Sequence, residues 1–90
     1  MKKTLVIGAS ANKSRYAAKA IKRLLDIGHD VIAVGKDRDK LYGVTIFDTM
    51  PSLNEVHTVT LYVNRHKQQA YYDQVIALKP KRVIFNPGAY

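Results

Sequence analysis

The segment of residues 4–16, TLVIGASANKSRY, restricts the fold of this chain more than any other part of it. An apolar run at residues 5–7 meets Gly8 and then small or polar residues, and a helical pattern begins near Arg15. This order predicts a buried strand, a tight turn and a helix, the first half of a β-α-β unit. The backbone N–H groups of such a turn and the helix N-terminus converge on one point, where phosphates bind. The segment therefore predicts a site for a phosphate-bearing ligand.

The rest of the chain alternates between strand and helix patterns. We expect helices at residues 14–27 and 65–78, main strands at 4–8, 30–34, 58–63 and 82–85, and a short edge strand at 44–47. Ser14 or Asn12 is a candidate cap for the first helix, and Gly28 suits the position after its end. Residues 35–40 read as a charged loop, and residues 50–56, with Pro51 near their start, as a short helical turn. In the second helix, the buried stripe is expected to contain Ala70, Tyr71, Val75 and Leu78.

Strands that alternate with helices predict an α/β fold with a parallel sheet and right-handed crossovers. Helices on both faces would make it a Rossmann-like, doubly wound, three-layer α/β/α sheet in a single domain of residues 1–90. The chain stops just after the fourth main strand, where such a sheet usually continues, so the pattern is also consistent with a truncated sheet. An open edge at that strand is consistent with pairing between two copies, that is, with a homodimer.

Composition excludes several classes of protein. The hydrophobic content of 47% argues against disorder, and no apolar run approaches the roughly 20 residues of a membrane span. The absence of cysteine excludes disulfides and thiol chemistry. The apolar run near the start is too short for a signal peptide and passes straight into a turn, so we expect a cytoplasmic protein.

The net charge of +8 favours an anionic partner, such as a phosphorylated small molecule, a nucleic acid or an acidic protein. A lysine-rich surface without a partner is the simpler explanation for many of these charges. No run of Lys and Arg is longer than two, and no aromatic RNA-binding motif occurs, which disfavours nucleic acid.

The carboxyl ends of parallel strands share one edge of the sheet, and ligands bind there where the strand order reverses. Four segments should meet at this edge: residues 8–15, 35–36, 62–64 and 86–88. In the first segment, Gly8 permits close backbone approach, and Ser10 and Asn12 can donate hydrogen bonds to phosphate oxygens. Lys13 and Arg15 can neutralise the charge. A plain strand-to-helix turn without a ligand is the alternative.

The same segments also indicate which class of nucleotide the site would bind. The Gly-x-Gly-x-x-Gly fingerprint of dinucleotide sites is absent, because Ser10 and Lys13 occupy the second and third glycine positions. Lys36 stands near the end of the second strand, where an NAD site would need an acidic residue. With Arg38, it favours a phosphate near the adenosine ribose, which fits NADP or coenzyme A better than NAD.

The chain resembles the small, stand-alone CoA-binding proteins, whose Rossmann-like domain is shared with the α subunit of succinyl-CoA synthetase. The resemblance covers essentially all ninety residues and depends on blocks whose spacing also fits. These blocks are Gly8-Ala9-Ser10 followed by Arg15, the helix end LLDIG, the strand VIAV after Asp30, Leu61-Tyr62 and Pro87-Gly88-Ala89.

The resemblance implies binding of coenzyme A or an acyl-CoA without catalysis. No pair of histidines in the sequence has the spacing of a metal site, so we expect no metal. The implied donors to the pyrophosphate are Gly8, Ala9, Ser10 and Asn12, and the implied cations beside it are Lys13 and Arg15. The adenosine end would be flanked by Val34, Gly35 and Lys36. One wall of the site would consist of Tyr62, Val63 and Asn64, and the other of Pro87 and Gly88. An NADP-binding reductase fragment and a basic module that binds protein or nucleic acid are the alternatives.

Overall fold

A six-stranded sheet with two helices makes up the computed structural model, which describes residues 3–12, 14–36, 38–53, 55–63 and 65–86, with residues 65–67 described by their backbone alone. In chain order the elements are β1 (Lys3–Ala9), α1 (Tyr16–Asp26), β2 (Asp30–Gly35), β3 (Asp39–Leu41), β4 (Val44–Phe47), β5 (Thr58–Leu61), α2 (Arg65–Leu78) and β6 (Arg82–Phe85). Four main strands and both helices therefore lie within a few residues of their predicted positions.

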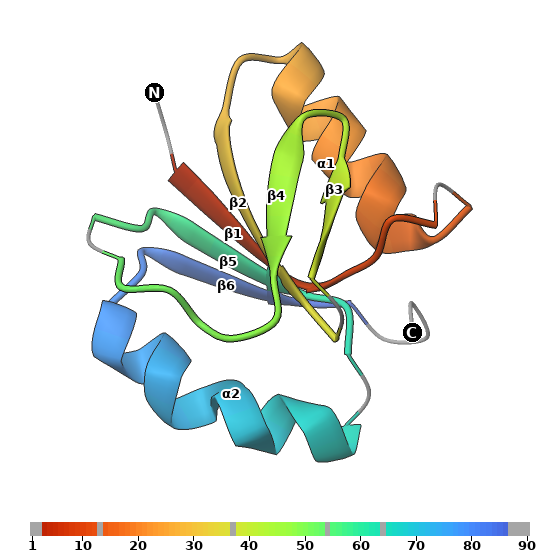
Figure 1. Ribbon diagram of the computed structural model, residues 1–90. Coiled ribbons are helices and arrows are strands. Elements are labelled where there is room, and N and C mark those ends of the chain that lie inside the picture. Colours follow the sequence, from red (N-terminus) through yellow and green to blue (C-terminus); the bar gives the residue numbers. More distant parts are fainter. Residues whose placement is uncertain (1–2, 13, 37, 54, 64, 87–90) are drawn as a thin grey trace.

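The sheet has the strand order β3-β4-β2-β1-β5-β6. Neighbouring strands are parallel except β3 and β4, which are antiparallel. The chain adds β2 on one side of β1 and later β5 on the other, so the strand order reverses at β1. The helices α1 and α2 cover opposite faces of the sheet (Figure 1). The predicted Rossmann-like, doubly wound α/β/α fold is confirmed.

Successive residues of β1 alternate between two hydrophobic clusters, one on each face of the sheet. Leu5 and Ile7 pack in the cluster that includes Val75 of α2, whereas Val6 packs in the cluster that includes Ile21 of α1. All three β1 side chains are fully buried. A strand covered by a helix on each face has no polar side, which explains why its sequence is an unbroken apolar run.

The stretch between β2 and β5 differs from the sequence-based expectation in two places. The expected charged loop at residues 35–40 ends in the strand β3, and β4, which was expected at the edge, lies between β3 and β2. Asp39 and Lys40 have little intrinsic preference for a strand. Their pairing is imposed by the turn at Tyr42 and Gly43, whose φ angles of 50° and 81° suit a tight two-residue hairpin.

Residues 50–53 and 55–57 contain no helix, so the short helical turn expected there is wrong. Glu55 has a φ of 57°, in the left-handed region, which a right-handed helix cannot accommodate. Val56 is buried instead, and Met50 and Leu53 pack against the cluster on the α2 side of the sheet. Burial of these apolar side chains on the sheet therefore sets the path of this connection.

The second helix buries less of its expected stripe than its sequence indicated. Val75 is buried and Tyr71 and Leu78 pack partly against the core, but Ala70 is exposed. Within the described residues, neither helix has the length and apolar character needed to cross a membrane.

The carboxyl ends of β1 and β2 approach closely because both contain glycine. Ala9 pairs with Gly35 after a shift of register that leaves Gly8 unpaired, as in a β-bulge. A Cβ added at Gly35 would overlap the carbonyl oxygen of Ala9 and lie 3.0 Å from Cγ2 of Ile46. The absence of a side chain at Gly35 is thus a requirement of strand packing.

Replacing Gly35 with alanine is expected to lower the free energy of unfolding by about 1–3 kcal/mol, because the obstructing atom belongs to the backbone and cannot rotate away. Urea unfolding followed by circular dichroism measures this loss. The control is Gly28→Asn, at a position with a φ of 85° where an added Cβ would meet no atom within 4 Å. Asparagine tolerates the left-handed region, so the control should lose less than about 1 kcal/mol. Equal losses in both variants would contradict this role of Gly35.

Candidate ligand-binding site

Gly8 lies near the carboxyl end of β1, beside the residues that follow β5. Its φ is 95°, and a Cβ there would lie 2.7 Å from the carbonyl oxygen of Tyr62 and 2.9 Å from Cγ1 of Val63. The backbone N–H of Tyr62 donates to the carbonyl of Ile7 at 2.8 Å, and this hydrogen bond holds the end of β1 beside the residues that follow β5. The segment of Tyr62 and Val63, which is part of the protein itself, therefore makes the close approach to the backbone that was expected at Gly8.

The turn from Ser10 to Arg15 is held in shape by its own polar groups. The hydroxyl of Ser10 accepts from the N–H of Asn12 at 3.1 Å. Oδ1 of Asn12 accepts from both the N–H of Ser14, at 3.0 Å, and its hydroxyl, at 2.7 Å. The N–H of Arg15 donates to the carbonyl of Asn12 at 3.1 Å. The Ser10 hydroxyl proton and the Asn12 amide group keep their capacity to donate to a ligand.

The first turn of α1 begins without the side-chain cap expected from Ser14 or Asn12. Arg15 is the N-cap residue, with extended backbone angles of −74° and 148°, and it makes no capping hydrogen bond through its side chain. Asn12 cannot cap the helix, because its side-chain oxygen is used inside the turn. The first N–H groups of α1 thus begin the helix without a side-chain acceptor, an arrangement that suits an anion.

An open cleft of about 860 Å³ lies over this turn. Nine of the residues predicted to bind the ligand line it: Gly8, Ala9, Ser10, Asn12, Arg15, Gly35, Lys36, Tyr62 and Val63. The structure thus brings together three of the four segments expected to meet at this edge of the sheet. The predicted contacts Lys13, Asn64, Pro87 and Gly88 lie outside the described residues.

Val34 does not line the cleft, although it was included among the predicted contacts. It has no exposed surface and packs in the hydrophobic cluster on the α2 side of the sheet. Side chains alternate between faces along a strand, so a residue before the strand end can belong entirely to the core. Only the end of β2, at Gly35 and Lys36, reaches the cleft.

The cleft is also lined by four residues that the sequence-based prediction did not include: Ala11, Asp39, Ala70 and Tyr71. Ala11 lies within the predicted turn, so its position could have been inferred. Asp39 reaches the cleft because β3 folds back beside β4, which the sequence pattern did not reveal. Ala70 and Tyr71 were assigned to the buried stripe of α2, and the helical pattern alone does not distinguish a core contact from a cleft contact.

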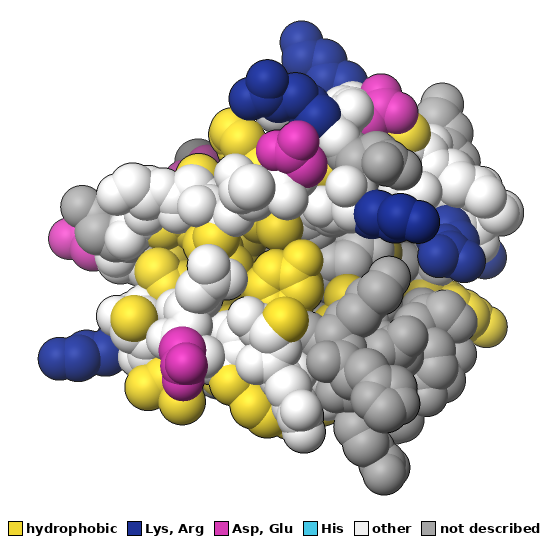
Figure 2. Space-filling view, turned by 60° about the horizontal axis from the view of Figure 1, so that its bottom comes forward, with side chains coloured by type: hydrophobic (Ala, Val, Ile, Leu, Met, Phe, Trp, Pro, Cys, Tyr) yellow, Lys and Arg dark blue, Asp and Glu magenta, His cyan; other side chains and the backbone are white. Residues whose placement is uncertain are grey.

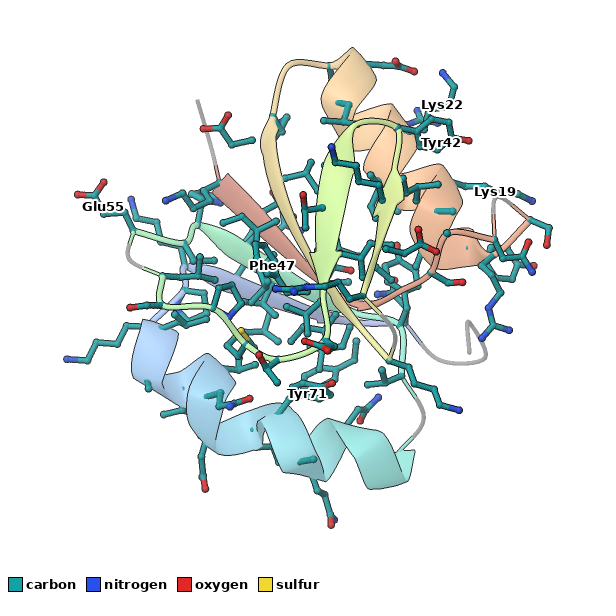
Figure 3. The ribbon with its side chains drawn as sticks, viewed as in Figure 1. Lys19, Lys22, Tyr42, Phe47, Glu55 and Tyr71 are labelled. Atoms are coloured by element: carbon teal, nitrogen blue, oxygen red, sulfur yellow. The ribbon has the colours of Figure 1, made fainter. Side chains whose placement is uncertain are left out.

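The start of α2 is tied to the end of β5 by Gln68, whose side-chain amide donates to the carbonyl of Val63 at 3.1 Å. This contact places the following residues of α2 beside the cleft. Tyr71 points from α2 toward the sheet (Figure 3) and is partly buried against the core. The helix therefore forms one wall of the cleft.

Among the residues that the structure describes, Arg15, Lys36 and Asp39 are the charged ones that line the cleft. Both cations are exposed. The carboxylate of Asp39 accepts from the backbone N–H of Lys40 at 2.8 Å, which leaves its second oxygen available. Within the described part of the chain, no group of three or more His, Cys, Asp or Glu side chains could hold a metal ion.

The described histidines lie away from the cleft. His29 and His57 precede β2 and β5, at the opposite ends of these strands. Nδ1 of His57 is 2.7 Å from the hydroxyl of Thr58. Neither residue lines the cleft, and the side chain of His66 lies outside the described residues.

Three solved structures have the same fold over nearly all of this chain. One, described as an uncharacterized protein, is 47% identical with a TM-score of 0.93, and the match covers 100% of this chain and 74% of that one. A hypothetical protein from Pyrococcus horikoshii is 28% identical with a TM-score of 0.83, and the match covers 99% of this chain and 63% of that one. A conserved hypothetical protein from Pyrococcus furiosus is 24% identical with a TM-score of 0.81, and the match covers 100% of this chain and 78% of that one. At this identity the match shows the fold alone.

No curated protein matches the chain. A family model described as a CoA binding domain, however, matches residues 2–90. This match confirms the resemblance inferred from the sequence, and it supports coenzyme A, a small molecule, as the ligand in general terms. The chain belongs to the CoA-binding domain family.

Proposed function

We propose that this chain binds coenzyme A or an acyl-CoA in the cleft over the turn of residues 8–15 and acts as a binding domain without catalysis. The observation that carries the proposal is that the turn, the uncapped start of α1 and two cations open into one cleft. Family membership supports the ligand. The absence of catalysis and the cytoplasmic location stay predictions.

The pyrophosphate of coenzyme A would lie over the turn. The hydroxyl of Ser10 and the backbone N–H groups at the start of α1 can donate to its oxygens. Arg15 can donate two parallel hydrogen bonds to one phosphate and neutralise part of its charge. The internal hydrogen bonds of the turn hold these donors in place before the ligand arrives, which reduces the entropy lost on binding.

The adenosine end would lie over β2 and β3, with Lys36 beside the ribose 3′-phosphate. Lys36 lines the cleft and is exposed. Asp39 lines the same end, and its available carboxylate oxygen can accept a hydrogen bond from a ribose hydroxyl or the adenine amino group. This end of the cleft therefore carries a cation that can contact a phosphate, Lys36, and a carboxylate that can accept a hydrogen bond from the adenosine, Asp39.

An NADP-binding reductase fragment is the second candidate, because Lys36 could also contact a 2′-phosphate. Arg38, which contributed to that hypothesis, is exposed but does not line the cleft. The glycine fingerprint of dinucleotide sites is also absent. These observations favour coenzyme A.

A homodimer through the edge of the sheet also stays a proposal. β6 is an edge strand, and Val83 and Phe85 are 39% and 48% exposed. Tyr72 of α2 meets Phe85 edge-to-face at 6.3 Å, so the exposed apolar surface extends onto the helix. An apolar edge strand of this kind favours pairing with another strand.

Replacing Arg15 with alanine is expected to weaken coenzyme A binding about tenfold to a hundredfold, because charge-assisted hydrogen bonds to the pyrophosphate are lost. Isothermal titration calorimetry measures the affinity. Arg23→Ala is the matched control, since Arg23 is an exposed arginine of α1 that does not line the cleft. Equal weakening in the two variants would indicate general charge attraction and contradict the proposed site.

Replacing Lys36 with alanine is expected to weaken binding of coenzyme A about fivefold and to leave 3′-dephospho-CoA unchanged, because only the former carries the phosphate that an exposed cation would contact. Lys81→Ala, at an exposed residue before β6, serves as the control. Parallel titrations with NADPH test the alternative. Tighter binding of NADPH than of coenzyme A by the unmodified chain would favour the reductase.

A further inference from the structure

A carboxylate, that of Asp39, lines a cleft whose other charged groups favour anions. The uncapped start of α1 and the cations Arg15 and Lys36 attract phosphate, whereas Asp39 repels it. Acidic and basic side chains are interspersed on the face of the molecule in Figure 2, so the position of Asp39 in the cleft is more informative than its nearness to cations. A negative charge at this place weakens nucleotide binding unless it meets a group that donates a hydrogen bond.

The reversal of the chain after β2 brings Asp39 to the same edge of the sheet as Lys36. β2 is parallel to β4, and β3, which begins at Asp39, is antiparallel to β4. The start of β3 therefore lies at the edge where β2 ends. Because Lys36 and Asp39 are three positions apart, their Cα atoms are separated by at most about 11 Å, so that both side chains can contact one ribose.

The side chain of Asp39 projects to the side of the sheet that α1 covers. Side chains two residues apart on a strand share a face, and Leu41 packs in the cluster that includes Ile21 of α1. This is the side on which the turn of residues 8–15 leads into the helix. A ligand whose phosphate lies on the turn therefore has Asp39 on the same side of the sheet.

The carboxylate of Asp39 retains its capacity to accept from a ligand. One oxygen accepts from the backbone N–H of Lys40 at 2.8 Å, which restricts the orientation of the group. Within the described residues, Asp39 forms no ion pair with Arg15 or Lys36. The second oxygen and the negative charge thus face the cleft without a described cation against them.

A cation and a carboxylate beside one ribose distinguish a phosphate from a hydroxyl. Lys36 attracts the phosphate, and Asp39 accepts a hydrogen bond from a hydroxyl but repels a phosphate in its place. Coenzyme A carries its phosphate on the 3′ oxygen and a hydroxyl at the 2′ position, and NADP has the two exchanged. We propose that Asp39 contacts the 2′-hydroxyl and makes the chain select the 3′-phosphate form of the nucleotide over the 2′-phosphate form.

This inference rests on the proposed function and adds the residue that determines its specificity. A phosphate group carries a charge of about −1.5 to −2 at neutral pH. Placing it beside an exposed carboxylate should weaken binding about tenfold, because solvent screens much of the repulsion.

The experiment is a calorimetric titration of the full chain with coenzyme A and with its isomer that carries the third phosphate on the 2′ oxygen. The two compounds have the same atoms and charge, so general attraction to a basic surface cancels in the ratio of their affinities. We expect the unmodified chain to prefer coenzyme A about tenfold. In Asp39→Asn, an oxygen that can accept from the hydroxyl is kept and the charge is removed, so the preference should fall below about threefold.

The matched control is Asp30→Asn, at an exposed aspartate that begins β2, at the opposite edge of the sheet, and does not line the cleft. It removes the same charge and should keep the tenfold preference. Equal binding of the two isomers by the unmodified chain, or an unchanged preference in Asp39→Asn, would overturn the role of Asp39 and leave the proposed function intact. An equal loss of preference in both variants would also overturn it. Failure of the unmodified chain to bind either isomer would instead remove the proposed function itself.

Discussion

The close approach of three strand ends at two glycines is the constraint on which the rest of this structure depends. Gly35 brings β2 against the carbonyl of Ala9, and Gly8 brings β1 against the backbone of Tyr62 and the side chain of Val63. Because these contacts involve backbone atoms, the carboxyl ends of β1, β2 and β5 have little freedom to move apart. The turn of residues 8–15, Lys36 and Tyr62 consequently surround one cleft. A glycine usually explained by its contact with a ligand serves here first to pack one strand end against another.

The parts of the fold that the sequence predicted are those with strong periodic patterns and short connections. The apolar run of β1 and the three- and four-residue steps of α1 were sufficient for the α/β order and hence for the edge at which a ligand binds. The missed parts depend on contacts between distant segments. The strand β3 follows from a hairpin turn, and residues 50–53 and 55–57 follow a path set by burial of Val56 and neighbouring side chains. Asp39 could not be assigned to the cleft without the path of β3, and the helical pattern of α2 did not distinguish a core contact from a cleft contact at Ala70 and Tyr71. Val34 is fully buried and does not line the cleft, because burial on a strand changes from one residue to the next.

The cleft lies over a turn whose shape is fixed by its own hydrogen bonds. Hydrogen bonds among Ser10, Asn12 and Ser14 fix the turn, and they leave the Ser10 hydroxyl proton and the Asn12 side-chain amide able to donate to a ligand. Among the described lining residues, Arg15, Lys36 and Asp39 carry charge, and Ala70 and Tyr71 of α2 do not. The net charge of +8 attracts anions in general, so selection of one anion would have to come from the groups that line the cleft.

The most direct test of this account is a titration of the 15N-labelled chain with coenzyme A, followed by two-dimensional NMR of its backbone amides. We expect the largest shift changes at residues 8–12, at Lys36 and Asp39, at Tyr62 and Val63, and at Ala70 and Tyr71, which line the cleft. Amides at the start of β6, at Arg82 and Val83, and in the last turn of α1 should change little, because these residues do not line the cleft and lie at the opposite edge of the sheet or at the far end of the helix. Changes concentrated at Arg82 and Val83, or spread evenly over the lysine and arginine residues of the surface, would contradict the account.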